Sequence, residues 1–301
     1  MNYAQLLFPD FSLILCGYLV CRYTALNRTV WQQVETLVYF FLFPALLFHS
    51  ITRTPLDLRT ASSLMGAGLT LGLSGIVLCY VLPYLPWLRH RIDVRQHAAA
   101  AQVGFRFNSF IGLALVDRLA GPQGLSQLAV LIGVCVPMFN IAAVWPMTRH
   151  GQHSFLRELI RNPLVITTAT ALSFNLAGLH IPGWLEPTVS RIGGASIALG
   201  LMAAGAGLQL DRLATDRVLS LGLLSVRHLI SPLIAFGLTQ AFGLDKVQAS
   251  VLLAFSALPT ASSAYVLAAR MGYDGPYVAG LVTLSTLLGM ASLPFALGLM
   301  P

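Results

Sequence analysis

Residues 105–112 read Phe-Arg-Phe-Asn-Ser-Phe-Ile-Gly and interrupt a long apolar run near its middle. A second interruption, Ser-Ala-Leu-Pro-Thr-Ala-Ser-Ser at residues 256–263, lies within a later apolar run. Pro259 lacks a backbone N–H and clashes with the preceding helical turn, while Asn108 and Gly112 tolerate non-helical backbone. The two stretches therefore predict two helices that break near their centres.

The composition around these stretches is typical of an integral membrane protein. Of the 301 residues, 56% are hydrophobic and only 10% are charged, whereas a soluble domain carries roughly 25% charged residues. The apolar runs are continuous over about the 20 residues that a transmembrane helix needs, and they lack the alternation of barrel strands. The sequence predicts an all-α integral membrane protein with ten transmembrane helices, at residues 5–22, 31–51, 61–82, 96–119, 125–148, 162–179, 186–210, 217–241, 247–270 and 276–299. Because the first run continues as a full span, we expect it to be retained rather than cleaved as a signal peptide.

Arginine and lysine residues predict the orientation of these helices, because cytoplasmic loops carry an excess of both. The connections after odd-numbered spans hold Arg22, Arg28, Arg89, Arg91, Arg95, Arg149, Arg157, Arg161, Arg212, Arg217 and Arg270, whereas those after even-numbered spans hold only Arg53, Arg59, Arg118 and Lys246. We therefore expect both termini on the extracytoplasmic side of the cell inner membrane and residues 150–161 in the cytoplasm. The net charge of +7 then comes from loop arginines that orient the helices, and no nucleic-acid partner is expected.

An internal repeat is predicted to divide the chain into residues 1–152 and 153–301, with five helices in each half. Because the number of helices per half is odd, the second half inserts upside down, and inverted repeats are typical of alternating-access transporters. The matching pairs, which share similar offsets, are LDLR at 56–59 with LDR at 210–212, Gln96 with Gln248, and Gly121 with Gly272.

The broken helices predict a site for an anion. Backbone groups exposed at this depth are tolerated only around a protein-lined cavity. Half-helices that begin near Gly112 and Thr260 would direct the positive ends of their dipoles into that cavity. The substrate-binding candidates within the two interruptions are Arg106, Asn108, Ser109, Gly112, Pro259, Thr260 and Ser262.

Polar side chains elsewhere in the spans add further candidates. Arg106 and Arg227 lie near midspan, with no Asp or Glu at comparable depth, and an arginine there needs a compensating partner. That partner is either a substrate carboxylate or backbone carbonyls at a helix break. His49 and Asn140 are also substrate-binding candidates, although packing or hydrogen bonds between helices would explain them equally well. Glu35 lies near a span end, where we expect it to be solvated.

Six stretches carry a family resemblance, namely Phe43–His49, Asn108–Gly112, Arg161–Leu164, Ala203–Gly207, Ala257–Pro259 and Tyr273–Asp274. Through them the whole chain resembles the auxin efflux carrier family of permeases, bacterial branch, in the superfamily that includes bile-acid carriers. The resemblance implies crossover helices 4 and 9, a scaffold from helices 1, 2, 6 and 7, and a transport unit from helices 3–5 and 8–10. It implies carboxylate substrates and a pocket-lining role for Asn108. Where members often have proline after the break, this chain has Ala114.

These features favour a transporter of small organic anions, either auxin-like or similar to malate or malonate, that works by alternating access. The alternatives are a sodium- or proton-coupled symporter of a larger amphipathic organic acid, and a non-transporting sensory module. An intramembrane enzyme is disfavoured, since no nucleophile is paired with a base and no metal cluster has ligand spacing. We expect no cofactor beyond a possible coupling H+ or Na+, and a homodimer formed through scaffold helices at the small-residue run Ala203–Gly207.

Overall fold

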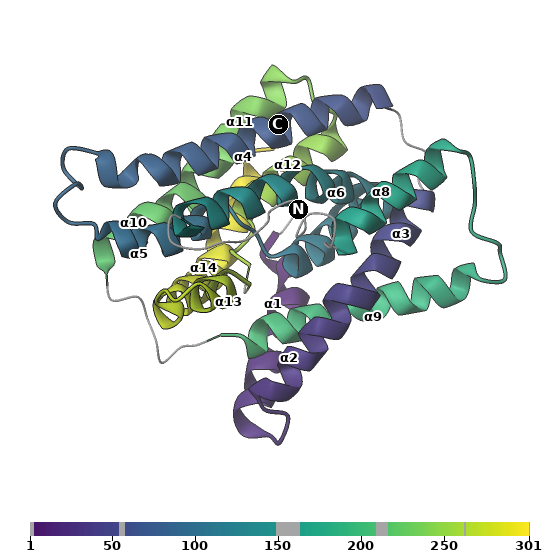
Figure 1. Ribbon diagram of the computed structural model, residues 1–301. Helices are drawn as coiled ribbons and strands as arrows, with labels where there is room; N and C mark the ends of the chain where they lie inside the picture. The colour runs from purple at the N-terminus through teal and green to yellow at the C-terminus, as the bar shows by residue number, and fades with distance from the viewer. Residues whose placement is uncertain (1–2, 54–57, 149–162, 209–215, 262, 301) are drawn as a thin grey trace.

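The protein is described by a computed structural model that covers residues 3–53, 58–148, 163–208, 216–261 and 263–300 (Figure 1). Within these residues every regular element is helical, which confirms the predicted all-α class. Two π-helical turns, Val38–Leu42 and Val226–Ile230, join α2 to α3 and α10 to α11, and 3-10 turns follow α4 (Leu82–Tyr84) and α5 (Ala101–Gly104). The α-helices are α1 (Tyr3–Tyr23), α2 (Arg28–Leu37), α3 (Phe43–Arg53), α4 (Leu58–Val81), α5 (Val94–Ala100), α6 (Ser109–Thr148), α8 (Pro163–Leu176), α9 (Glu186–Ala206), α10 (Arg217–Ser225), α11 (Ser231–Ala241), α12 (Lys246–Ala257), α13 (Ser263–Arg270) and α14 (Gly275–Gly298).

Several helices are long and apolar enough to cross a membrane. By length and composition, six segments of the described chain qualify: Arg28–His49, Ser62–Tyr84, Val94–Met147, Glu186–Ala206, Arg217–Ala241 and Gly275–Gly298. The apolar helices Phe11–Tyr23 and Lys246–Ala257 are shorter. The chain is therefore a multi-pass membrane protein, while the total of ten spans stays a prediction.

Short polar side chains cap the starts of α2, α5, α10, α12 and α14. An aspartate or asparagine oxygen accepts hydrogen bonds from the first free backbone N–H groups of a helix and so stabilises its start. Asp93 accepts from Arg95 N at 2.7 Å at the start of α5, and Asp245 accepts from Gln248 N at 2.9 Å at the start of α12. The cap residues are Asn27, Asp93, Asp216, Asp245 and Asp274.

Two glycines turn the chain where the repeat pattern aligns them. Gly121 has φ 55° and separates two helical parts of α6, close to the boundary expected between the spans 96–119 and 125–148. Gly272 has φ 76° and precedes α14. Left-handed backbone is accessible to glycine at no steric cost. The proposed repeat itself stays a prediction.

The small-residue run of α9 packs within the chain. A Cβ added at Gly205 would lie 1.7 Å from the carbonyl oxygen of Ile14, and one added at Gly17 would lie 1.9 Å from that of Met202. Small residues thus let the backbones of α1 and α9 approach closely. Residues 203–207, whose close packing was expected to support a homodimer, are buried inside one chain. The homodimer itself stays a prediction.

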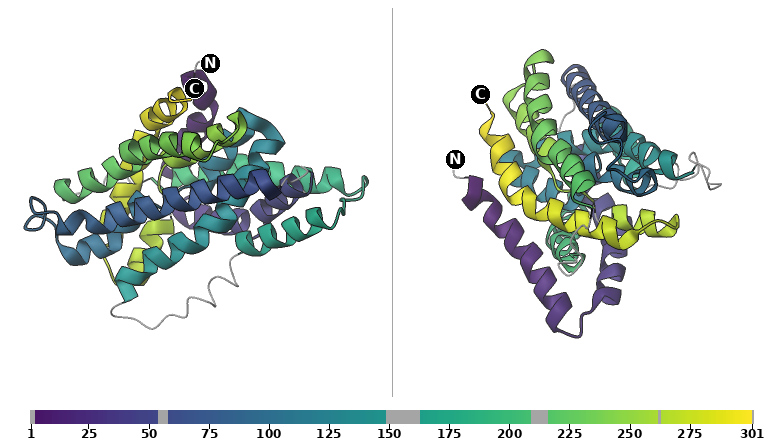
Figure 2. Two further views of the ribbon diagram at one scale, coloured as in Figure 1. Left: turned by 90° about the horizontal axis from the view of Figure 1, so that it is seen from above. Right: turned by 90° about the vertical axis from the view of Figure 1, so that its left-hand side faces the viewer.

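A second group of helices surrounds α12, where α4, α6, α11 and α14 pack against it. Every residue from Gln248 to Ala257 is buried, as expected for a helix that is apolar on all faces. The start of α1 and the end of α14 lie close together in both views of Figure 2. Because Gln248–Ala257 are all buried, the end of α12, where the second interruption begins, lies deep in the molecule.

Candidate functional site

The first helix break occupies residues 105–108, between the 3-10 turn after α5 and the start of α6. Asn108 caps α6, because its Oδ1 accepts from Phe110 N at 2.9 Å and from Ile111 N at 3.3 Å. The half-helix was expected to begin near Gly112, but it begins at Ser109. The asparagine cap explains the earlier start, since it satisfies the N–H groups of the first turn.

The second break includes residues 258–261, between α12 and α13. Leu258 has ψ 139°, an extended value that the residue before a proline favours. Thr260 was expected near the start of the next half-helix, but α13 begins at Ser263. The Thr260 side chain is instead fully buried, and its hydroxyl donates to Val103 O and, at 3.2 Å, to Arg106 O.

The two breaks are hydrogen-bonded to each other. Asn108 N donates to Pro259 O at 2.7 Å, and the Thr260 hydroxyl donates to Arg106 O in the first break and to Val103 O in the 3-10 turn before it. Backbone groups that leave a helix inside a membrane protein need such partners, because no water or lipid group replaces them. A Cβ added at Gly289 would lie 2.6 Å from the Pro259 ring, so α14 packs directly against the second break.

Arg227 and His228 support the second break. Arg227 is 3% exposed, and it donates from Nε to Leu258 O at 2.5 Å and from Nη2 to Phe255 O at 3.1 Å. These carbonyls belong to the end of α12, where intrahelical partners are missing and a cation is favoured. The sequence left two partners open for Arg227, a substrate carboxylate or backbone carbonyls at a helix break. In the structure its partners are the carbonyls of Phe255 and Leu258.

His228 connects this support to α14. Its Nε2 hydrogen-bonds with Ser285 Oγ at 2.8 Å, and its Nδ1 with Ser292 Oγ at 2.7 Å. Ser285 Oγ in turn accepts from Thr260 N at 3.0 Å, and Ser292 Oγ donates to Ala257 O at 3.2 Å. Both ends of the second break are therefore held by side chains that do not line the cavity described next.

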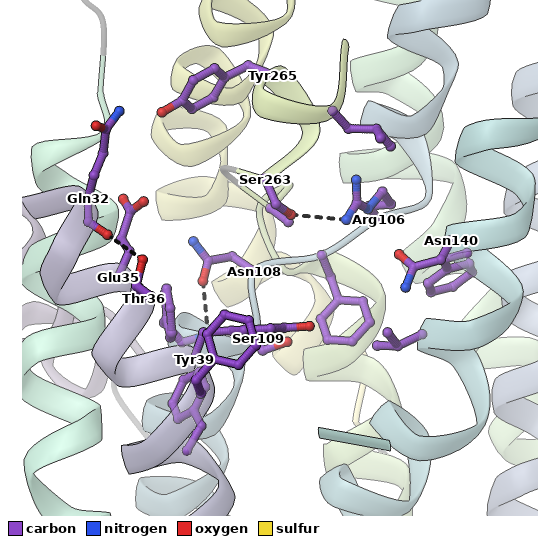
Figure 3. Close-up of a pocket in the computed structure, with 18 of the residues that line it drawn as sticks. Gln32, Glu35, Thr36, Tyr39, Arg106, Asn108, Ser109, Asn140, Ser263 and Tyr265 are labelled. Carbon is purple, nitrogen blue, oxygen red and sulfur yellow. Dashed lines mark hydrogen bonds between the residues drawn. The ribbon is translucent and has the colours of Figure 1, made fainter. Parts of the chain in front are cut away.

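A cavity of about 700 Å³ lies where the two breaks face α2 and α6 (Figure 3). Four predicted site residues line it, namely Arg106, Asn108, Ser109 and Asn140. Its volume is in the range of small-molecule sites, roughly 300–1,000 Å³. The predicted residues that do not line this cavity are His49, Gly112, Arg227, Pro259 and Thr260, and Ser262 lies outside the described residues.

Arg106 brings a positive charge into the cavity wall. Its Nη1 donates to Gln102 Oε1 at 2.8 Å, and its Nη2 donates to Ser263 Oγ at 3.0 Å, from the first residue of α13 (Figure 3). A guanidinium has five N–H donors and stays protonated in proteins. The arginine thus joins the two broken helices and presents a charge to whatever fills the cavity.

Comparison with known proteins decides the family. A family model described as membrane transport protein matches residues 140–297, which is more than half of the chain. The chain belongs to this family, the auxin efflux carrier permeases. It is therefore a membrane transporter and not an enzyme, and the family resemblance identified in the sequence is confirmed.

Curated relatives of this family match over nearly the full chain. An uncharacterized transporter of Methanothermobacter thermautotrophicus is 26% identical over 290 residues, which cover 94% of this chain and 93% of the relative. The uncharacterized transporter YfdV of Escherichia coli is 25% identical over 280 residues, covering 88% and 87%. A proposed malonate transporter of Rhizobium meliloti is 22% identical over 303 residues, covering 95% and 92%.

In this family member, α2 and the π-helical turn that follows it supply a wall of the cavity that is not among the predicted site residues. Gln32, Glu35, Thr36 and Tyr39 all line the cavity. Their spacing places them on one face of a helix, which was the available signal. Glu35 was expected to be solvated near a span end, but its side chain is only 23% exposed and forms an ion pair with Arg28 at 2.9 Å.

The ion pair also reaches α13. Arg28 Nη2 donates to the hydroxyl of Tyr265 at 2.6 Å, and Tyr265 lines the cavity as well. Arg28 therefore connects the α2 wall with the α13 wall. His49, by contrast, is buried at the end of α3, with its Nε2 3.6 Å from Glu186 Oε1.

Proposed function

We propose that this transporter binds a small organic anion, a carboxylate, between its two helix breaks and carries it across the cell inner membrane by alternating access. The observation that carries the proposal is the cavity itself, because Arg106 and Asn108 of the first break and Ser263 at the end of the second all line it. Two segments distant in sequence thus place polar donors around one space of ligand size.

Electrostatics favour an anion in this cavity. Asn108 and Ser109 form the cap and first residue of α6, and Ser263 is the first residue of α13. Helix N-termini carry a partial positive charge, and discontinuous helices in transporters use it to bind anionic groups. Arg106 adds a full charge with donors in a planar arrangement that matches a carboxylate.

Aromatic residues favour a substrate with an apolar body. The rings form much of the cavity wall and offer flat apolar surface. Phe107 packs against Phe255 and Phe139, with ring centroids 4.6 and 6.1 Å apart, so these rings are held in place. This favours acids larger than malonate and supports the larger amphipathic acid as the second candidate substrate. The aromatic lining residues are Tyr39, Phe40, Phe43, Phe107, Phe110, Phe139 and Tyr265.

The packing supports a division into a scaffold and a moving unit. The scaffold would consist of α1, α2 with α3, α8 and α9, in which α1 packs on α9 and α8 on α3. The moving unit would consist of the helices around α12. The paired caps Asp93 and Asp245 and the paired turns Gly121 and Gly272 support two inverted repeats, with α5 and α12 as the first halves of crossover helices.

Flux into proteoliposomes tests the proposal. A panel of labelled aliphatic and aryl monocarboxylates and dicarboxylates should give saturable uptake for at least one acid, and corresponding neutral amides should give none. Imposed pH and sodium gradients in the same assay identify H+ or Na+ as the coupling ion, or uniport. Saturable uptake of neutral or cationic solutes only would contradict the proposal.

A further inference from the structure

Two charged residues face the cavity, and they carry opposite charges. Among the residues that line it, Arg106 is the cation and Glu35 is the carboxylate. Figure 3 shows them on different sides of the cavity, with Asn108 drawn between them. We propose that Glu35 determines substrate specificity: it selects monocarboxylates whose far end carries a hydrogen-bond donor and rejects dicarboxylates. This inference rests on the proposed function, since it assumes that a substrate carboxylate binds on the Arg106 side.

Glu35 is held in a fixed position by the protein. Arg28 Nη1 donates to its Oε1 at 2.9 Å, and Arg28 Nη2 donates to the Tyr265 hydroxyl at 2.6 Å. Arg28 does not line the cavity. The arginine thus stabilises Glu35 in its charged form without offering its own charge to a ligand. A carboxylate anchored in this way cannot easily turn aside for an anionic ligand, which is what discrimination requires.

The chemistry of a carboxylate explains the selection. An ionised carboxylate only accepts hydrogen bonds, so the Glu35 side can be satisfied by a hydroxyl, amide or ammonium group of the substrate. A second substrate carboxylate brings no donor and repels Glu35 at short range. Sites built to hydrogen-bond a substrate group reject analogues that lack it far more strongly than apolar pockets reject a changed methylene.

The neighbours of Glu35 fit the same selection. Gln32 and Thr36 lie on the same face of α2 and line the cavity, and the Thr36 hydroxyl donates to Gln32 O at 2.8 Å. Neither residue brings a positive charge for a second carboxylate. A purely structural role of the Arg28–Glu35 pair is the competing explanation, and it predicts that loss of Glu35 weakens every substrate equally.

Two matched acid series test the inference on the purified full chain. One series is butyrate, gamma-hydroxybutyrate and succinate, and the other is phenylacetate, para-hydroxyphenylacetate and para-carboxyphenylacetate. Within a series only the far group changes. In the wild-type protein we expect calorimetry to show, in at least one series, that the hydroxy acid binds at least about tenfold more tightly than the dicarboxylate. A tenfold difference in affinity corresponds to about 1.4 kcal/mol of binding free energy.

Variants of Glu35 separate charge from structure. Glu35→Gln keeps an acceptor for Arg28 and removes the charge. The dicarboxylate should then bind more tightly, so that its affinity comes within about threefold of the hydroxy acid's affinity. Glu35→Asp keeps the charge and should keep the preference. If Glu35→Gln does not fold, the wild-type ratios remain decisive.

The outcomes distinguish this inference from the proposed function. Equal binding of dicarboxylate and hydroxy acid by the wild-type protein in both series would overturn the specificity role, and so would a uniform loss for all acids in Glu35→Gln. Either result leaves the anion site intact. If no acid of either series binds or is transported, the proposed function fails, and the inference fails with it.

Discussion

Replacing Asn108 by aspartate separates two functions that this side chain combines. The Oδ1 atom caps α6 by accepting from Phe110 N at 2.9 Å and Ile111 N at 3.3 Å, while the amide NH2 group turns away from that helix (Figure 3). Aspartate keeps the cap, because Asp and Asn are equally good N-cap residues. It also replaces the only donor of the side chain by a negative charge beside the proposed anion.

The expected magnitudes follow from these contacts. Asn108→Ala loses the cap, which costs about 1 kcal/mol of stability. It also loses a hydrogen bond to a charged group, worth roughly 1.5 to 3 kcal/mol, so affinity should fall roughly tenfold to a hundredfold. Asn108→Asp should keep the cap and yet lose more affinity than the alanine variant, since repulsion is added to the lost bond.

Thermal unfolding and calorimetry on the same detergent-solubilised samples measure both effects. Asn27 provides a matched control, because it is exposed and caps α2 with the same geometry, accepting from Thr29 N at 3.0 Å and Val30 N at 3.4 Å. Asn27→Asp should leave anion affinity unchanged. Wild-type affinity in Asn108→Asp would refute the claim that this amide donates to the substrate.

Three further predictions concern the charge in the site, the residues that support it, and the orientation of the chain in the membrane. Arg106→Gln should weaken anions far more than neutral amides of the same shape, because mainly the Coulombic attraction is lost, and equal losses for both in calorimetry would count against it. Arg227→Met leaves the carbonyls of Phe255 and Leu258 without their donor, so unfolding should be easier by about 1 to 3 kcal/mol while the folded fraction still binds substrate; an unchanged melting temperature would argue against this supporting role. A cysteine placed within residues 150–161 should react with impermeant reagents only from the cytoplasmic side, and periplasmic labelling would reverse the orientation.

The sequence predicts the breaks because their cause is local. Proline and asparagine act on the backbone where they stand, so both interruptions were correctly located near Asn108 and Pro259. The sequence predicts half-helices that begin near Gly112 and Thr260, because it shows only which residues tolerate irregular backbone. The cap that Asn108 provides, and the burial of Thr260 against Val103, decide the actual starts at Ser109 and Ser263.

Contacts between distant helices could not be predicted from one sequence. The sequence shows that Arg227 needs a partner, but the carbonyls of Phe255 and Leu258 become that partner only because the π-helical turn packs on the end of α12. Glu35 was likewise expected to be solvated near a span end, because one sequence does not show which helices pack against that residue. Its place in the cavity wall depends on how α2 faces the breaks, and its partner Arg28 binds Tyr265, which is 237 residues away along the chain.

The most direct test of an anion held between the breaks is substrate protection of a thiol at position 109. Ser109 lines the cavity at the start of α6, so Ser109→Cys, with Cys16 and Cys21 replaced by serine, places a reactive group within the proposed site. We predict that an impermeant thiol reagent labels this residue and that a transported carboxylate slows the labelling in proportion to its occupancy, while its neutral amide does not. A labelling rate unaffected by saturating amounts of a carboxylate that the same protein transports would contradict the account.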